Sequence, residues 1–131
     1  MTTKEITSQS KALSVSMPRL LLHLEGLAVL VVALAFYGMR GYSWWAFALL
    51  LFTPDLAMVF YLIDARVGSV AYNSVHFYAV PLALGGIALA TGWGLGLQLA
   101  LIWLVHIGMD RTLGYGLKYP TEFKDTHFNH I

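Results

Sequence analysis

The residues of this chain that could carry out chemistry are a few ionisable side chains set in strongly apolar segments. His106 and Asp110 lie four residues apart in the stretch WLVHIGMDRTLGYGLKYP, residues 103–120, so on a helix both side chains face the same side. Asp55 and His76 each lie in another apolar run. Imidazole and carboxylate groups are ligands of zinc, manganese and iron. We therefore expect Asp55, His76, His106 and Asp110 to bind a divalent transition metal.

Other polar residues could complete such a site. A metal with an open coordination position activates water for hydrolysis, and we expect Glu25 or Asp110 to serve as the catalytic base. Glu25 is also a candidate fifth ligand. Arg111, Lys118 and Tyr119 follow at the polar end of the last apolar run, where they could bind an anionic head group or phosphate at the membrane surface.

The elements that must position these residues are predicted to be membrane-spanning helices. Of the 131 residues, 58% are hydrophobic and only 11% are charged, and the mean hydropathy is +0.67, which is far from the balance of soluble proteins. A helix needs about 20 apolar residues to cross a bilayer. We predict an all-α, four-transmembrane-helix bundle with short hairpin loops over 17–119, with spans at about 17–38, 44–63, 70–91 and 93–110.

The alternating direction of four spans brings the candidate residues to one face of the membrane. The start of the first and third spans and the end of the second and fourth share that face, together with polar tails at 1–16 and 120–131. All Lys and Arg residues except Arg40 also belong to it. Since basic residues favour the inside of the cell membrane, we expect both termini and the polar cluster to be cytoplasmic.

The composition also excludes several classes of site. The chain has no cysteine, so it cannot form disulfides, thiolate zinc sites or iron–sulfur clusters, and it has no thiol nucleophile. The net charge of +1 is small and scattered, which argues against a nucleic-acid partner. The expected surroundings are the lipid bilayer and an amphiphilic or lipid-like substrate.

Three other interpretations of the polar residues stay open at this stage. The acids and histidines could pair with one another and with Arg111 or Lys118, as an internal network of a structural or partner-binding membrane subunit. His76 and His106 on facing helices could instead bind a haem or another pigment. The chain could also assemble as a homo-oligomer or join a larger membrane complex.

Four stretches together resemble a known family: LEGLAVL at 24–30, SWWAFALLLFTPDLAMVFYL at 43–62, YNSVHFYAVPLAL at 72–84 and WLVHIGMDRTLGYGLKYPTEFKDTH at 103–127. It is a family of small bacterial integral membrane proteins known as domain of unknown function 4260. The resemblance implies a multi-pass protein of the bacterial inner membrane and implies no particular reaction.

A looser resemblance is to four-helix membrane-bound metal-dependent hydrolases, which also place Asp and His at helix ends near one membrane face. Asp55, His76, His106 and Asp110 are similar in kind, although the Asp-x-Asp-His and His-Arg-x-x-Thr-His-Ser strings of those proteins are missing here. This resemblance implies metal-dependent hydrolysis at the cytoplasmic membrane face.

Overall fold

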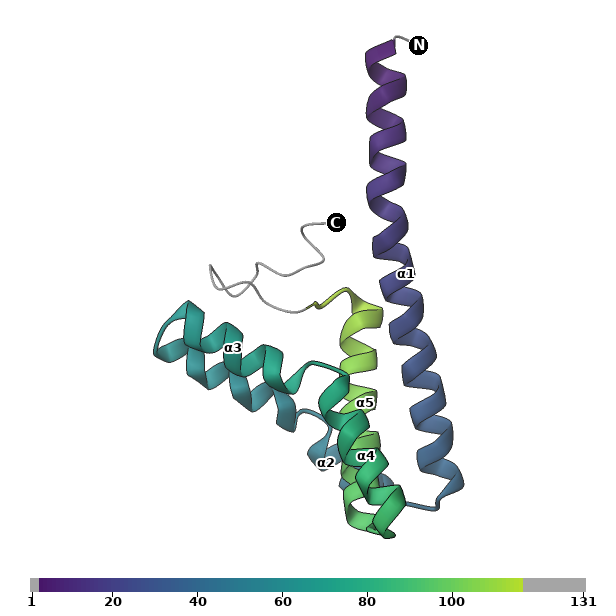
Figure 1. Ribbon diagram of the computed structural model, residues 1–131, viewed down its shortest axis with the longest axis vertical. Coiled ribbons are helices and arrows are strands. Elements are labelled where there is room, and N and C mark those ends of the chain that lie inside the picture. Colours follow the sequence, from purple (N-terminus) through teal and green to yellow (C-terminus); the bar gives the residue numbers. More distant parts are fainter. Residues whose placement is uncertain (1–2, 117–131) are drawn as a thin grey trace.

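The computed structural model describes residues 3–116, without the side chains of residues 5–16 (Figure 1). The elements in chain order are α1 (Thr3–Met39), α2 (Trp44–Leu50), the 3₁₀ helix η1 (Thr53–Leu62), α3 (Ala65–Val75), α4 (Ala79–Thr91) and α5 (Gly94–Leu113). Residues 3–116 contain no strand, so the expected all-α class is confirmed. The first helix begins at Thr3, inside the segment expected to be a polar tail.

Three helical stretches are long and apolar enough to cross a membrane: Met17–Met39, Trp44–Leu62 and Ala65–Thr91. The last expected span corresponds to α5, which is 20 residues long and carries His106, Asp110 and Arg111 in its second half. Most residues of α5 are buried against other helices, whereas most residues of the three candidate membrane spans are not buried. Since α5 faces protein rather than lipid, it can carry polar side chains that a lipid-facing helix could not.

Helix α5 is the centre around which the bundle packs. Figure 1 shows α1 running along the length of α5 and α4 lying beside its first half. The apolar core joins these three helices and consists of Ala33, Tyr37, Ala88, Leu97, Leu101, Ile102 and Val105. On α5 the core ends at Val105, so the residues that follow on this helix need other contacts to hold them.

Two glycines provide the closest of those contacts. A methyl group on Gly26 of α1 would overlap the Cβ atom of Arg111, and one on Gly108 of α5 would lie 2.9 Å from the Gly26 carbonyl oxygen. Small residues of this kind let helix backbones approach closely in membranes. Nearby, Nδ1 of His23 lies 2.8 Å from the carbonyl oxygen of Thr112. These contacts fix the position of α5 along the axis of α1.

The second and third expected spans are each divided in two. The second breaks between α2 and η1, where Pro54 occupies the first turn of η1. The third breaks between α3 and α4, four residues before Pro81. Proline has no N–H group, and its ring clashes with the carbonyl four residues earlier, so Pro81 prevents α4 from continuing back through Phe77. As a result η1 and α3 pair as a hairpin that projects sideways from the bundle (Figure 1).

The contact between α1 and α5 can be tested with two glycine substitutions. Replacing Gly26 by Ala should lower the free energy of unfolding by about 1–3 kcal/mol, because the added methyl group forces the helices apart. The matched variant is Gly86→Ala, where the methyl group meets no atom within 4 Å. Thermal unfolding in detergent should show Gly26→Ala less stable and Gly86→Ala as stable as the wild type or more so; equal stability of the two would contradict this packing.

Candidate metal centre

The two helix breaks bring four ionisable side chains to one point. Asp55 lies in the first turn of η1, directly after Pro54, and His76 is the residue that ends α3. His106 and Asp110 lie one turn apart on the central helix α5. One potential ligand atom from each of these four residues lies within 4.8 Å of all the others. The convergence expected from the alternating spans is therefore present, and we call this group the four-ligand cluster.

The distances within the cluster are short and even. The Nε2 atoms of His76 and His106 are 3.0 Å apart. Asp55 Oδ1 lies 3.0 Å from the first of these nitrogens and 3.1 Å from the second. Asp110 Oδ2 lies 3.5 Å from His76 Nε2 and 3.3 Å from His106 Nε2. These are five of the six separations among four atoms, all of which lie within 4.8 Å of one another, so the four potential ligand atoms form a compact group.

Separations of this size fit ligand atoms around one metal ion. Zinc bonds to imidazole nitrogen at about 2.0–2.1 Å and to carboxylate oxygen at about 2.0–2.2 Å, which places tetrahedral ligand atoms about 3.3–3.6 Å apart. The cluster separations of 3.0–3.5 Å fall close to that range. The four donors thus need only small shifts to surround an ion.

Burial gives the cluster an inner and an outer side. The side chains of His76 and His106 are fully buried, whereas Asp110 is 11% and Asp55 31% exposed. Both carboxylates line a cavity of about 340 Å³. The histidines therefore close the site from behind, and the carboxylates face the space from which a substrate could approach.

The surroundings of the two imidazoles differ. His76 Nδ1 lies 2.8 Å from the carbonyl oxygen of Tyr72, and the Tyr72 ring stacks on the imidazole at 3.6 Å between centroids. A neutral His76 that donates from Nδ1 presents the lone pair of Nε2 to the cluster, the arrangement common in metal-bound histidines. His106 Nδ1 is buried with no hydrogen-bond partner among the described residues, and the Phe52 ring meets its imidazole edge-on at 6.1 Å. On its Nδ1 side, packing rather than a hydrogen bond thus positions the His106 ring.

Side chains of α5 bind the carbonyl groups that the break after α3 leaves without helical partners. The indole N–H of Trp103 donates to the Val75 carbonyl. Arg111 donates from Nη2 to the His76 carbonyl at 3.0 Å and from Nη1 to the Tyr115 carbonyl at 2.9 Å. Irregular backbone at membrane depth is tolerated only where protein or water satisfies it. These two side chains therefore hold the bend on which the position of His76 depends.

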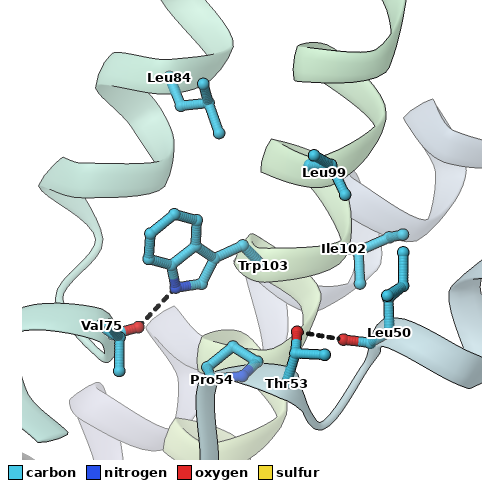
Figure 2. Close-up of a pocket in the computed structure, with 8 residues that line it drawn as sticks. All are labelled: Leu50, Thr53, Pro54, Val75, Leu84, Leu99, Ile102 and Trp103. Carbon is cyan, nitrogen blue, oxygen red and sulfur yellow. Dashed lines mark hydrogen bonds between the residues drawn. The ribbon is translucent and has the colours of Figure 1, made fainter. Parts of the chain in front are cut away.

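Figure 2 shows this bend beside a second, mainly apolar cavity of about 290 Å³. Trp103 points from α5 toward the end of α3, and its hydrogen bond to Val75 crosses one side of the cavity. At the other break, the hydroxyl of Thr53 donates to the Leu50 carbonyl at 2.7 Å. Each interruption of a span thus has a side-chain donor for a freed carbonyl.

The other predicted site residues lie elsewhere. Glu25 is exposed on α1 and is not part of the four-ligand cluster. Arg111, expected at the surface, is buried and only 6% exposed, because its guanidinium group binds backbone carbonyls in the interior. Lys118 and Tyr119 lie outside the described residues.

Sequence reasoning missed two residues that support the site, Tyr72 and Trp103. Both resemble ordinary membrane aromatic residues in the sequence. Tyr72 lies one helical turn before His76, and that spacing is the only signal that it could orient the imidazole.

Comparison with known protein families gives a match over most of the chain. Residues 19–131 match the family described as a domain of unknown function, DUF4260. The chain belongs to this family. The DUF4260 match includes the whole four-ligand cluster and both helix breaks. No curated protein and no solved structure matches the chain.

The role of Trp103 can be tested by replacing it with Phe. The Val75 carbonyl would then lose its donor in the protein interior, which should lower the free energy of unfolding by about 1–3 kcal/mol. The matched control is Trp45→Phe, since Trp45 is 83% exposed and its substitution should change stability by about 0.5 kcal/mol or less. Thermal unfolding of the two variants in the same detergent gives the comparison; a Trp103→Phe variant as stable as Trp45→Phe would show that the indole hydrogen bond does not hold the bend.

Proposed function

We propose that this DUF4260 protein is a metal-dependent membrane hydrolase, with a divalent transition metal bound by Asp55, His76, His106 and Asp110. The observation that carries the proposal is the close approach of the four potential ligand atoms beside a cavity. A set of two nitrogens and two oxygens suits zinc, manganese or iron.

Charge balance supports a divalent ion in this position. The two nitrogens that face each other at 3.0 Å have room for one hydrogen between them, so both imidazoles cannot carry a proton on Nε2. With neutral imidazoles and two carboxylates the cluster has a charge of −2, which is costly within a membrane. One divalent cation bound among the four residues neutralises that charge.

The same distances argue against a haem. Two axial histidines bind haem iron from opposite sides of the ring plane, and atoms of the macrocycle need about 3.5–4 Å of van der Waals separation from their neighbours. The Nε2 atoms are 3.0 Å apart and both approach the same carboxylate oxygen. No room for a planar macrocycle lies between them.

The reaction that suits this site is hydrolysis of an ester or amide of an amphiphile. A bound metal supplies an activated water and polarises the substrate carbonyl. For this, Asp55, His76 and His106 would keep the metal and Asp110 would give up its position to the water. The freed Asp110 carboxylate, which lines the cavity, would accept a proton from that water as the water oxygen bonds to the acyl carbon. The bond from the acyl carbon to the leaving oxygen or nitrogen then breaks, and the proton passes from Asp110 to the leaving group. His76 and His106, buried behind the carboxylates, keep the site closed on the opposite side.

The site is proposed to work at the cytoplasmic face of the bacterial inner membrane. The start of α1 and the end of α5 lie toward the end of the bundle that holds the cluster (Figure 1). Lys4 and Arg19 belong to α1 at this end and Arg66 to the start of α3, whereas Arg40 lies at the other end of α1. The distribution of basic residues supports cytoplasmic termini.

Hydrolysis can be tested with the full-length protein in nanodiscs and fluorogenic fatty-acid esters as substrates. Activity should vanish on treatment with a chelator and return on addition of zinc. Replacing Asp110 by Asn should lower the rate roughly 10²–10⁴-fold, because the base is lost. Replacing Asp64, the carboxylate that caps α3 and lies outside the cluster, by Asn should leave the rate unchanged.

Each variant must first elute as the wild type does in size-exclusion chromatography. Hydrolysis that survives both the chelator and Asp110→Asn would contradict a metal-dependent reaction at this site. So would a zinc-loaded wild-type protein that hydrolyses none of a series of acyl esters and amides.

A further inference from the structure

The cavity beside the cluster has one polar end and otherwise apolar walls. Asp55 and Asp110 stand at the polar end. The rest is lined by Phe52, Met58, Tyr72, Met109, Leu113 and Tyr115. Its volume of about 340 Å³ lies within the range of small-molecule sites in proteins. A ligand that fills it must therefore combine one polar group with an apolar part.

The cavity opens among exposed apolar side chains. Phe52, Leu113 and Tyr115 line it and are 58%, 65% and 55% exposed. Beyond them, the neighbouring helix η1 has no buried residue, and Leu56 and Leu62 on it are 71% and 85% exposed. Exposed apolar surface of this kind marks contact with a membrane or another protein, and in a chain with helices apolar enough to cross a membrane it fits the bilayer. The mouth of the cavity thus faces the acyl chains of the bilayer rather than water.

Building on the metal centre proposed above, we propose that this cavity binds the single acyl chain of an amphiphilic substrate that enters sideways from the bilayer. The carbonyl group at the head of the chain lies beside the two carboxylates, and the chain lies along Met58, Met109 and Leu113. Methionine side chains are flexible and pack against chains of varied shape. The site therefore selects its substrate by an apolar chain and a compact polar head.

The other large cavities suit this ligand less well. A groove of about 460 Å³ between α1 and α4 is lined by apolar residues and Tyr78 and has no carboxylate or imidazole. The cavity in Figure 2 has Thr53 and Trp103 as its polar lining residues and no ionisable group. Neither offers a group that would bind or cleave a carbonyl head.

The test compares two metal-binding probes, dodecanohydroxamate and acetohydroxamate, on the zinc-loaded protein in nanodiscs by titration calorimetry. They share a head group, so a difference in affinity reports the chain. We expect the long-chain probe to bind at least about a hundredfold more tightly, since each buried methylene group adds affinity. Met58→Trp, which fills the cavity, should abolish that preference while zinc content stays at the wild-type level.

Val32→Trp is the matched control, because Val32 lines the groove between α1 and α4. The long-chain probe partitions into the nanodisc lipid equally with either variant, so a difference between the two variants reports binding to the protein. It should keep the chain-length preference. Leu113→Trp at the mouth is a second blocking variant for use if Met58→Trp fails to fold.

Equal affinity of the two probes in the wild type would overturn the inference, even with zinc bound and esters hydrolysed. A preference lost in Val32→Trp and kept in Met58→Trp would also overturn it and place the chain in the other groove. A preference lost in Met58→Trp without any hydrolysis would support the acyl-chain site and remove the hydrolase assignment.

Discussion

The structure depends on the satisfaction of backbone carbonyl groups where apolar helices break inside the membrane. The break after Val75 places His76 at the end of α3 rather than inside a longer straight helix. The break before Thr53 places Asp55 in the first turn of a new helix, η1. Each unpaired carbonyl in hydrocarbon costs several kcal/mol. Trp103 and Arg111 on α5 remove that cost at the break after α3. The helix that supplies two residues of the four-ligand cluster thus also supplies the donors that hold a third, His76, in place.

The buried position of α5 makes this arrangement possible. Its close contact with α1 at Gly26 and Gly108 fixes the position of His106 and Asp110 along α1. Because α1 and α4 cover α5 and leave it little exposed to lipid, polar side chains can gather on one helix without facing hydrocarbon. The hairpin of η1 and α3 then closes the cluster from the side and, with the end of α5, leaves the cavity at the carboxylates.

The sequence predicted the all-α class and the meeting of Asp55, His76, His106 and Asp110, because the alternation of apolar segments alone determines which ends share a face. It did not predict that two spans are divided. A proline such as Pro54 can either kink a continuous helix or end it, and the effect of Pro81 depends on whether another helix can bind the freed carbonyls. The burial of Arg111 was missed for the same reason, since its partners are backbone atoms that no side-chain pattern reveals. Glu25 lies toward the same membrane face as the cluster, but its side chain is exposed on α1. The alternation of spans predicts how deep a residue lies in the membrane, but not from which side of its helix the side chain projects.

Elemental analysis of the purified protein tests the central claim most directly. The protein would be purified without chelator, beside His106→Ala and beside His23→Ala, a control histidine at the contact between α1 and α5 and outside the cluster. We predict one divalent transition metal ion per chain in the wild type and in His23→Ala, and none in His106→Ala. A folded wild-type protein that contains no metal and takes up no zinc, manganese or iron would contradict the account and leave the four residues as an internal polar network.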